Sequence, residues 1–393
     1  MTTRARERLA YFESLRDDAV DLLRRLVAID SPTTDKAGVD RVGALVAEEF
    51  RAVGARVTLI PQERAGNVLR ATFGRVGDPG AGDRSPGRPA AMLLGHLDTV
   101  WPLGEAARRP FRIEGPFAYG PGAYDMKAGI VLCALLARAT GEGVLRPSIP
   151  IVCVLSGDEE TGSPASRPHI EAEARAAGFV LGLEPSQPDG GAKTSRKGVG
   201  RIVVEVNGVP AHAGIDPEKG VNAIEELAAQ ILAIKLLEDR ATGTTVHAGL
   251  IEGGVAKNVV APRARAELDV RVPSPEEWAR IETAILNLRP RDPRARLRVE
   301  AALTHPPMVR TAAIAALYEE ARRVAREAGF DLGEGSTGGG SDGSHCAALG
   351  VPVLDGLGVE GEGAHAEGER VRLDRIAARA AFLAGLLERV ESP

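Results

Sequence analysis

Histidine and acidic residues occur in this sequence at positions where a metal ion could be bound. They stand where apolar segments end or where glycines crowd a turn, and no cysteine occurs among them. Imidazole nitrogens and carboxylate oxygens suit zinc, with cobalt or manganese as plausible substitutes. The sequence therefore predicts a metal centre, whose candidate ligands are His96, Asp125, Glu160, Glu184 and His365.

His96 and Asp98 are two residues apart in HLDTV, which ends an apolar run. In an extended backbone their side chains point to the same face. The histidine can then hold a metal while the carboxylate accepts its second ring N–H and fixes the tautomer. The alternative is structural, because a single histidine at a strand end is more often a structural residue than a ligand.

The other candidate ligands also have structural alternatives when each is taken alone. Asp125 in GPGAYDMKAG could cap the helix that follows, since aspartate is a favoured N-cap residue. Glu184 could be an ordinary exposed acid at the end of GFVLGLE, and His365 an ordinary loop histidine in GEGAHAEGERV. The metal interpretation depends on the conjunction of these segments.

Three consecutive acids, residues 158–160, stand in SGDEETGS after another apolar segment. Their charges repel one another unless cations neutralise them, which a metal cluster would do. A solvated acidic turn is the alternative, and it is the commoner fate of such a run.

The elements that must position these residues alternate between apolar strands and helices. Strands are expected in 57–60, 67–73, 90–100, 148–160 and 178–186, and helices over about 4–28, 126–140 and 164–177. The Gly/Pro-rich stretch 74–89 predicts an exposed loop. This pattern predicts an α/β fold with a mixed, largely parallel sheet, whose ligands bind beyond the carboxyl ends of the strands. His96, Glu159, Glu160 and Glu184 would lie there.

After about residue 197 the pattern changes to β-α-β-β-α-β, which is typical of a ferredoxin-like sandwich. Residues 197–308 are therefore expected to form an inserted domain. A helix over 311–328, a strand at 352–357 and a final helix from about 374 resume the first style. The catalytic, metal-binding domain is thus expected to be discontinuous, over 1–196 and 309–393.

Composition excludes several classes of function. The chain has 393 residues, 44% of them hydrophobic, and a net charge of −5, so no global field attracts nucleic acid or an anionic membrane. The N-terminus lacks the pattern of a secretory signal, and no apolar run reaches membrane-spanning length, which predicts a cytoplasmic protein. Cys133, Cys153 and Cys346 form no CxxC pair, and the first two are expected in the core.

Along nearly its whole length the chain resembles the zinc-dependent glutamate carboxypeptidase and aminoacylase family, most closely its carboxypeptidase G-like members. The segments GHLDTV, GPGAYDMKAG, SGDEETGS, LEPS, NGVPAHAG, STGGGSDGSH and AHAEGERV carry the resemblance, in the family's order and approximate spacing. The family's fold, a catalytic α/β domain interrupted by a smaller dimerisation domain, agrees with the division above. The resemblance thus implies a homodimer and two zinc ions per subunit.

The resemblance also implies a role for each residue of the site. Asp125 would bridge the two metals, one also held by His96 and Glu184 and the other by Glu160 and His365. Asp98 would orient His96, and Glu159 would be the general base that takes a proton from water. Two features depart from the family: Tyr124 stands before the bridging acid, where a small residue is more common, and position 184 is Glu rather than Asp.

Further residues are implied in oxyanion stabilisation and substrate binding. His212 in VPAHAG is similar to the family histidine that reaches the active site of the partner subunit; its alternative is a turn histidine. Asn258, Arg271 and the glycines Gly338, Gly339 and Gly340 are similar to positions that hold the substrate carboxylate. The alternatives are an exposed strand arginine paired with an acid, and a flexible loop. A phosphate-binding loop is disfavoured because GxxxxGK[ST] is absent.

The sequence therefore predicts a metallopeptidase that cleaves the amide bond next to a C-terminal amino acid. Two alternatives remain: an N-acyl-amino-acid deacylase with the same site, and a non-catalytic metal-binding interaction protein. The second is disfavoured because Glu159 and every candidate ligand are present. The expected partners are a small peptide or acyl-amino-acid substrate and a second copy of the chain.

Overall fold

The structure of the protein is a computed structural model that describes residues 1–74 and 89–390. The stretch 75–88, which holds most of the expected exposed loop, lies outside the described residues. The chain divides into two compact units. The first contains Met1–Ser195, Arg310–Ser336 and Ser341–Pro393, and the second contains Arg196–Val309 and Thr337–Gly340. Each unit is described by itself.

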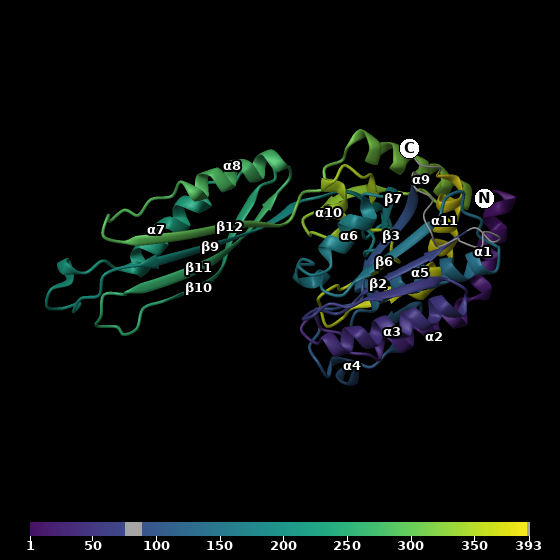
Figure 1. Ribbon diagram of the computed structural model, residues 1–393, viewed down its shortest axis with the longest axis horizontal. Coiled ribbons are helices and arrows are strands. Elements are labelled where there is room, and N and C mark those ends of the chain that lie inside the picture. The colour runs from purple at the N-terminus through teal and green to yellow at the C-terminus, as the bar shows by residue number, and fades with distance from the viewer. Residues whose placement is uncertain (75–88, 391–393) are drawn as a thin grey trace. The chain divides into compact units, whose positions relative to one another are not determined.

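A six-stranded sheet forms the centre of the first unit (Figure 1), with the strand order β1-β2-β6-β3-β7-β14. The strands are β1 (Arg56–Ile60), β2 (Val68–Phe73), β3 (Ala90–His96), β6 (Ile151–Ser156), β7 (Ala177–Gly182) and β14 (Val353–Leu354). β3 runs parallel to β6 and β7, and β14 runs parallel to β7. β2 runs antiparallel to both β1 and β6. The prediction of a mixed, largely parallel sheet is confirmed.

Helices contact both faces of this sheet, which explains why every residue of β3 and β6 is buried. α3 (Lys36–Ala52) and α5 (Ala128–Gly141) contact one another and the sheet, as do α6 (Arg167–Ala174) and α10 (Asp342–Ala348). α9 (Ala312–Ala328) and α11 (Ile376–Arg389) pack against one another, and α9 also contacts β14. Cys133, Cys153 and Cys346 are free and buried, as expected for the first two. None of the helices in the described residues is long and apolar enough to cross a membrane.

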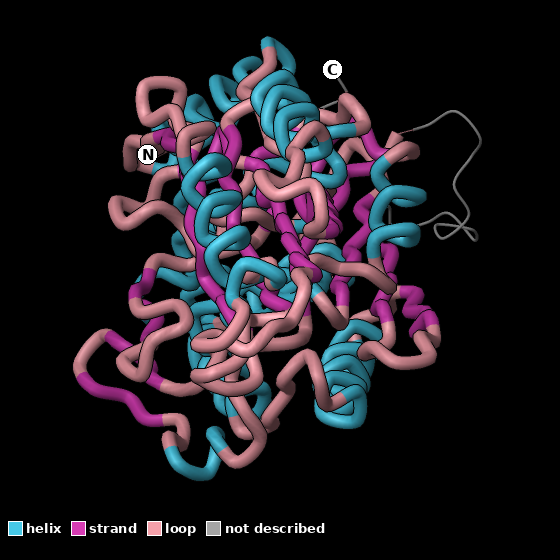
Figure 2. The backbone as a smooth tube through the Cα atoms, turned by 90° about the vertical axis from the view of Figure 1, so that its left-hand side faces the viewer, coloured by secondary structure: helices cyan, strands magenta, loops and turns pink. Residues whose placement is uncertain are grey.

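The expected helix over about 4–28 is two helices, α1 (Thr3–Ser14) and α2 (Arg16–Val27). At the junction the Ser14 hydroxyl donates to the carbonyl of Tyr11, at 2.6 Å. The amide of Leu15 donates to the carbonyl of Phe12 rather than to that of Tyr11. The helical pattern is thus interrupted at Leu15, and amphipathic periodicity does not reveal this break. Figure 2 follows such short helices, strands and connecting loops through the whole described chain.

The carboxyl ends of the parallel strands bring three site segments together. His96 is the last residue of β3, η2 (Glu159–Thr161) follows β6, and Glu184 follows β7. Because parallel strands end at the same edge of a sheet, these side chains converge there. The irregular helical turn η1 (Ala123–Lys127) leads into α5 and carries Asp125.

A small antiparallel sheet positions the last site segment. It contains β4 (Arg112–Glu114), β5 (Phe117–Tyr119), β15 (Gly361–Glu362) and β16 (Arg370–Arg372), in the order β15-β16-β5-β4. β5 leads into the turn that carries Asp125, and the turn between β15 and β16 carries His365. Pairing of β16 with β5 therefore brings the two turns together. The remaining short elements are α4 (Glu105–Arg108) and η4 (Leu373–Arg375), together with β8 (Ala192–Arg196) and β13 (Glu334–Thr337), whose last residues belong to the second unit.

The second unit is a four-stranded antiparallel sheet with two helices. Its elements follow in the order β9 (Gly198–Asn207), η3 (Pro217–Lys219), α7 (Ala223–Lys235), β10 (Thr245–Gly253), β11 (Arg263–Val272), α8 (Pro275–Leu286) and β12 (Arg296–His305). The strand order is β10-β11-β9-β12. Apart from the short η3 turn, this is the β-α-β-β-α-β succession expected from the sequence.

Residues Thr337–Gly340 belong to this second unit, although the sequence places them in the catalytic domain. Two arginines of the second unit bind this loop. Arg196 donates to the carbonyls of Gly339 and Gly340, at 3.1 and 2.9 Å, and Arg271 donates to the carbonyl of Gly338, at 3.0 Å. Such side-chain contacts between distant residues cannot be read from hydrophobic periodicity.

Candidate metal centre

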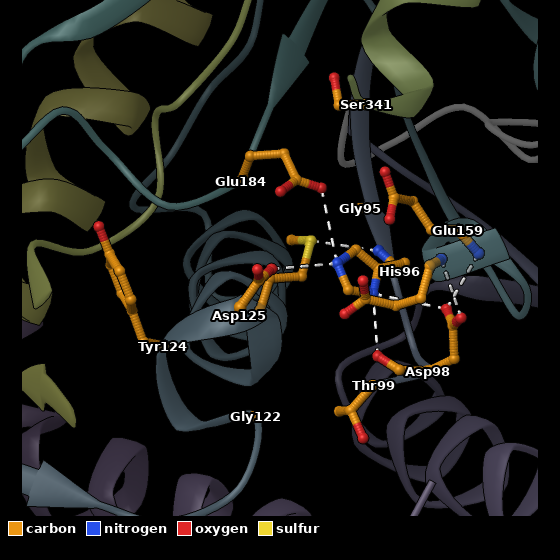
Figure 3. A network of polar contacts seen from close by, with 12 residues as sticks. Gly95, His96, Asp98, Thr99, Gly122, Tyr124, Asp125, Glu159, Glu184 and Ser341 are labelled. Atoms are coloured by element: carbon orange, nitrogen blue, oxygen red, sulfur yellow. Dashed lines mark hydrogen bonds and ion pairs between the residues drawn. The ribbon is translucent and has the colours of Figure 1, made fainter. Parts of the chain in front are cut away.

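Asp125 lies between two histidines that come from distant segments. Its Oδ1 is 3.3 Å from Nε2 of His96, and its Oδ2 is 3.4 Å from Nε2 of His365. Figure 3 shows Asp125 and Glu184 facing the His96 ring. One carboxylate therefore presents a separate oxygen to each histidine.

Each histidine also has a second acidic neighbour. Nε2 of His96 is 3.6 Å from Oε1 of Glu184, and Nε2 of His365 is 3.3 Å from Oε2 of Glu160. Ligand atoms of His96, Asp125 and Glu160 all lie within 4.8 Å of one another. The structure thus brings together all the candidate ligands that the sequence predicts, in two groups that share Asp125.

The ring of His96 is fixed by contacts of its other nitrogen. Nδ1 is 2.9 Å from the backbone carbonyl of Asp98 and 3.4 Å from its Oδ1, so the carbonyl is the nearer acceptor. Either contact places the proton on Nδ1 and leaves Nε2 to face Asp125 and Glu184. The backbone amide of His96 is 3.2 Å from Sδ of Met126. A Cβ at Gly95 would lie 2.4 Å from Cε of that methionine, so a larger residue there would displace the methionine side chain.

The carboxylate of Asp98 mainly organises the acidic turn. It accepts the backbone amides of Glu159 and Glu160, each at 3.2 Å, and the hydroxyl of Thr33 at 2.6 Å. Figure 3 shows the carboxylate of Asp98 facing the backbone of Glu159, beside the His96 ring. One buried acid thus holds both the histidine and the turn that carries the next two acids.

The electrostatics of the site couple the histidines to the acids. Hydrogen bonds with Asp125 and Glu160 raise the pKa of His365 to about 10. Burial lowers the pKa of His96, but the hydrogen bonds with Asp125 and Asp98 outweigh it and raise the pKa well above its usual range. Burial would raise the pKa of Asp125, yet the hydrogen bonds of the two histidines hold it well below its usual range. The carboxylates therefore stabilise a positive charge placed between them.

The carboxyl group of Glu159 is buried among other acids. Removal of water around the Glu159 carboxyl raises its pKa well above the usual range, and the negative charge of Glu184 adds to this effect. A carboxyl group with a raised pKa beside a cluster of acids is suited to taking up and releasing a proton.

The donor set fits a divalent cation. Oε1 of Glu160 is buried and has no hydrogen-bond partner within the described residues, although a buried carboxylate oxygen is normally satisfied. Acidic side chains outnumber the histidines, so the cluster carries excess negative charge. Both observations are explained if these residues hold metal, and histidine and carboxylate donors suit zinc.

Asp158, the first acid of the run 158–160, has a structural role. Its carboxylate accepts the backbone amides of Ala165 and Ser166, at 2.7 and 3.3 Å. The expectation that a cation would have to neutralise all three acids therefore needs correction, because hydrogen bonds satisfy this one. Asp158 thus stabilises the turn that carries Glu159 and Glu160.

Two further acids near the site were not singled out from the sequence. Asp342 accepts the hydroxyls of Ser156, at 2.6 Å, and of Ser163, and burial raises its pKa to about 6. Glu369 accepts backbone amides around Asp125. Both stand in segments that carry the family resemblance, STGGGSDGSH and AHAEGERV, and that position was the only available signal.

The predicted oxyanion and substrate residues lie in the second unit, at two different ends of its sheet. His212 and Asn258 are close together: Ala213 donates to the carbonyl of Asn258, and His212 forms a β-bridge with Val259. Nδ1 of His212 accepts the amide of Gly214 at 3.1 Å. In the neutral ring the proton is then on Nε2, which makes this exposed nitrogen a hydrogen-bond donor.

Arg271 stands near the other end of β11. Its guanidinium forms a bidentate ion pair with Asp269, with both N–O distances at 2.8 Å, besides its bond to Gly338. This is the pairing that the structural alternative describes. Gly340 is required by space, since its Cβ would lie 2.8 Å from the His305 ring, whereas a Cβ at Gly338 would meet nothing within 4 Å.

One copy of the second unit cannot bring Asn258 and Arg271 together. Strand β11 begins at Arg263, beside the segment with Asn258, and Arg271 pairs with Val199 at the other end of β9. Eight residues of extended strand separate positions 263 and 271, which corresponds to about 26 Å at roughly 3.3 Å per residue. A small substrate could contact both only if two copies contributed.

Comparison with known proteins shows which family the chain matches. The model of peptidase family M20/M25/M40 matches residues 92–389. Carboxypeptidase G2 of Pseudomonas sp. (strain RS-16) is 31% identical over 377 residues, which cover 94% of this chain and 88% of that protein. Succinyl-diaminopimelate desuccinylase of Gluconobacter oxydans is 28% identical over 384 residues, which cover 91% of this chain and 94% of that protein.

Solved structures show the same fold. Aminopeptidase PepT from Bacillus cereus has a TM-score of 0.74 at 22% identity, and the match covers 95% of this chain and 98% of that one. A metallo-carboxypeptidase from Sulfolobus solfataricus has a TM-score of 0.73 at 16% identity and covers 94% and 98% of the two chains. The resemblance seen in the sequence is confirmed: the chain belongs to peptidase family M20/M25/M40 and is a metallopeptidase or amidohydrolase.

Proposed function

We propose that the protein is a zinc-dependent hydrolase that cleaves the amide bond next to a C-terminal amino acid, as a glutamate carboxypeptidase does. The observation that carries the proposal is the carboxylate of Asp125, which presents one oxygen to His96 and the other to His365. Each histidine has a further acid beside it, Glu184 or Glu160. This is the donor arrangement of two metal positions that share one ligand.

The residues present would hold two zinc ions, with cobalt or manganese as possible substitutes. His96, Asp125 and Glu184 would hold one ion, and Asp125, Glu160 and His365 the other. A pair of such ions polarises the scissile carbonyl and makes hydroxide available from water near neutral pH.

Glu159 is the proposed general base. It is adjacent to Glu160, and its raised pKa suits a group that accepts a proton from water and passes it to the leaving nitrogen. Asp98 binds the amides of both glutamates, so it fixes the proton-transfer residue and the candidate ligand in one turn. It also contacts His96.

The relatives support an amide bond next to an amino acid but differ in the acyl group. They include proteins named carboxypeptidase G2, acetylornithine deacetylase and succinyl-diaminopimelate desuccinylase. The zinc-loaded protein should be incubated with matched panels of peptides ending in glutamate, other dipeptides, and N-acetyl and N-succinyl amino acids. Fastest release of C-terminal glutamate supports the carboxypeptidase, preference for N-acyl amino acids supports the deacylase, and turnover of none supports a metal-binding interaction protein.

The active form is proposed to be a homodimer. β10 pairs with β11 on one side only and forms an edge of the sheet, with Leu250 and Ile251 exposed by 65 and 63%. Leu232 on α7, which contacts β10, and Leu236 just after this helix are exposed by 68 and 84%. An apolar edge strand of this length favours pairing with a second copy. Dimerisation would also explain how Asn258 of one copy and Arg271 of the other can bind the same substrate molecule.

His212 is expected to stabilise the oxyanion in the active site of the partner subunit. Its Nε2 carries the proton of the neutral ring, so it can donate to a developing negative charge. We expect His212→Ala to lower kcat by about a hundredfold or more, the usual effect of removing one oxyanion donor, while metal content stays unchanged.

Subunit mixing tests this role directly. A hybrid of His212→Ala and Asp125→Ala subunits contains one site with an intact metal centre and an intact histidine from the other chain. Its activity should rise well above that of either variant alone. If subunits exchange and activity does not rise, the histidine does not act across the interface.

Arg271 is expected to bind the free carboxylate of the substrate. Its guanidinium would keep its contact with the loop Gly338–Gly340. Losing a charge-assisted bidentate contact costs about 2 to 5 kcal/mol when the partner charge stays buried. Arg271→Ala should therefore lose most kcat/KM on substrates with a free C-terminal carboxylate. Arg265→Ala is the matched control, since Arg265 is on the same strand and also pairs with an acid two residues away, Glu267.

A substrate with its carboxylate amidated separates this role from damage to the strand. The parent should hydrolyse the amidated substrate poorly, and Arg271→Ala should be little worse. Equal hydrolysis of acid and amide by the parent would refute carboxylate recognition. Arg271 would then be an exposed strand residue that pairs with Asp269.

A further inference from the structure

Glu369 is a buried acid that joins three segments of the candidate metal centre. Its side chain accepts four N–H groups: Oε1 accepts from the amides of Tyr124 and Asp125, at 2.9 and 3.0 Å, and Oε2 accepts from the amide of Gly122, at 2.8 Å, and from Nε1 of Trp101, at 2.7 Å. The residue is 1% exposed. A carboxylate has about four acceptor sites, so these donors use its capacity.

The backbone that Glu369 binds is irregular. Gly122 has a φ of 72°, a Cβ there would lie 2.6 Å from Cγ2 of Thr99, and Asp125 and Met126 have non-helical dihedral angles. Amides in such a turn cannot all be satisfied by regular helical bonds, and a buried unpaired amide is costly. The carboxylate of Glu369 supplies the missing acceptors. Turns whose backbone amides converge commonly bind an anion in this way.

The same residue also belongs to the turn that carries His365. The amide of Glu369 donates to the carbonyl of Ala366, and the amide of Ala366 donates to the carbonyl of Gly363, so positions 363–369 form consecutive tight turns. His365 has a φ of 61°, an uncommon value for a residue with a side chain. Its Nε2 lies 3.4 Å from Oδ2 of Asp125. Glu369 therefore links the turn of one candidate ligand to the backbone of another.

Trp101 brings in the segment that follows His96 and Asp98. Its indole N–H binds Glu369, and the guanidinium of Arg109 stacks over its ring at 4.0 Å from the centroid. One carboxylate thus ties together the end of β3, the Asp125 turn and the His365 turn. All four partners of the Glu369 side chain are N–H donors, so the arrangement suits an ionised carboxylate, which only accepts hydrogen bonds.

We infer that Glu369 is a positioning residue that holds the shared carboxylate of Asp125 and the ring of His365 in register for metal binding. The inference rests on the proposed metal centre. It predicts that Glu369→Gln weakens metal binding, because the amide NH2 of glutamine would face N–H donors that the carboxylate now satisfies. Loss of such an outer contact typically lowers metal affinity by about ten- to a hundredfold.

Glu226 offers a matched control in the second unit. It is also a buried carboxylate, 6% exposed, and it accepts the amide of Arg291 at both oxygens and the side-chain amide of Gln230. Glu226→Gln should lower the unfolding temperature of the metal-free protein about as much as Glu369→Gln does. It should leave metal affinity unchanged, because it does not touch the candidate ligands.

The decisive measurement is the zinc dissociation constant of the metal-free full-length proteins, obtained by competition with a chromogenic chelator. We expect a rise of about ten- to a hundredfold for Glu369→Gln and a smaller rise for Trp101→Phe, which removes one of the four donors. Glu226→Gln should match the parent. A Glu369→Gln protein that is folded and binds zinc as tightly as the parent overturns the inference.

The outcome can be separated from that of the proposed function. If the parent binds zinc but hydrolyses none of the amide substrates, the proposed reaction is wrong, while the comparison of dissociation constants still decides the role of Glu369. If Glu369→Gln and Glu226→Gln weaken zinc binding equally, Glu369 contributes only general stability and the inference is overturned. A parent that binds no zinc overturns both.

Discussion

Asp125→Ala is expected to yield a folded protein that has lost the metal from both positions. The parent should bind roughly two equivalents of zinc, as two-metal hydrolases do. Because each oxygen of Asp125 faces a different histidine, removal of this one side chain takes a ligand from both positions at once. Amidase activity should fall to background.

Metal analysis after dialysis is the direct measurement. Asp158→Asn is the matched control, since Asp158 belongs to the nearby acidic turn but binds the amides of Ala165 and Ser166. An amide oxygen at that position can still accept one of them, so its metal content should equal that of the parent. Two full equivalents retained in Asp125→Ala would show that this carboxylate is not the shared ligand.

The second large effect is expected from Glu159→Gln, which should retain its metal and lose turnover. Removal of a general base typically lowers kcat by about a hundredfold to ten-thousandfold. Glutamine has nearly the shape of glutamate, so the turn held by Asp98 should persist. The loss should appear in kcat at saturating substrate.

Glu160→Gln is the informative comparison because it changes the adjacent residue in the same way. Oε2 of Glu160 lies 3.3 Å from Nε2 of His365, and its Oε1 lacks a hydrogen-bond partner within the described residues. Metal content should therefore fall in this variant. Near-normal turnover by Glu159→Gln, or equal metal loss in both variants, would contradict the division of tasks between these neighbours.

Part of the site could be predicted because its residues stand at recognisable places in local patterns. His96 ends an apolar strand, Glu160 and Glu184 follow two others, and parallel strands that share a sheet end at one edge. The mixed sheet and the order of elements in the second unit follow from the same periodicity, since burial on one or both faces dictates which positions are apolar. The family was identified from motifs, and the comparisons confirm it.

Local patterns failed where a single polar contact changed the outcome. Amphipathic periodicity predicted one helix over 4–28, but the chain breaks at Leu15, next to the contact between the Ser14 hydroxyl and the Tyr11 carbonyl. Charge repulsion suggested that a cation neutralises all three acids 158–160, but the carboxylate of Asp158 accepts hydrogen bonds from two backbone amides. Periodicity records which face is buried and carries no information about which hydrogen bond a side chain chooses.

The sequence by itself thus determined the family, the order of elements and the types of residue available to the site. Tertiary structure decided which of them meet: that Asp125 lies between two histidines, that Glu369 binds amides 244 to 247 residues earlier in the chain, and that Asn258 and Arg271 lie at different ends of one sheet. The physical reason is that these contacts join segments far apart in sequence. Their geometry is fixed by strand pairing and turn conformation, which no local pattern encodes.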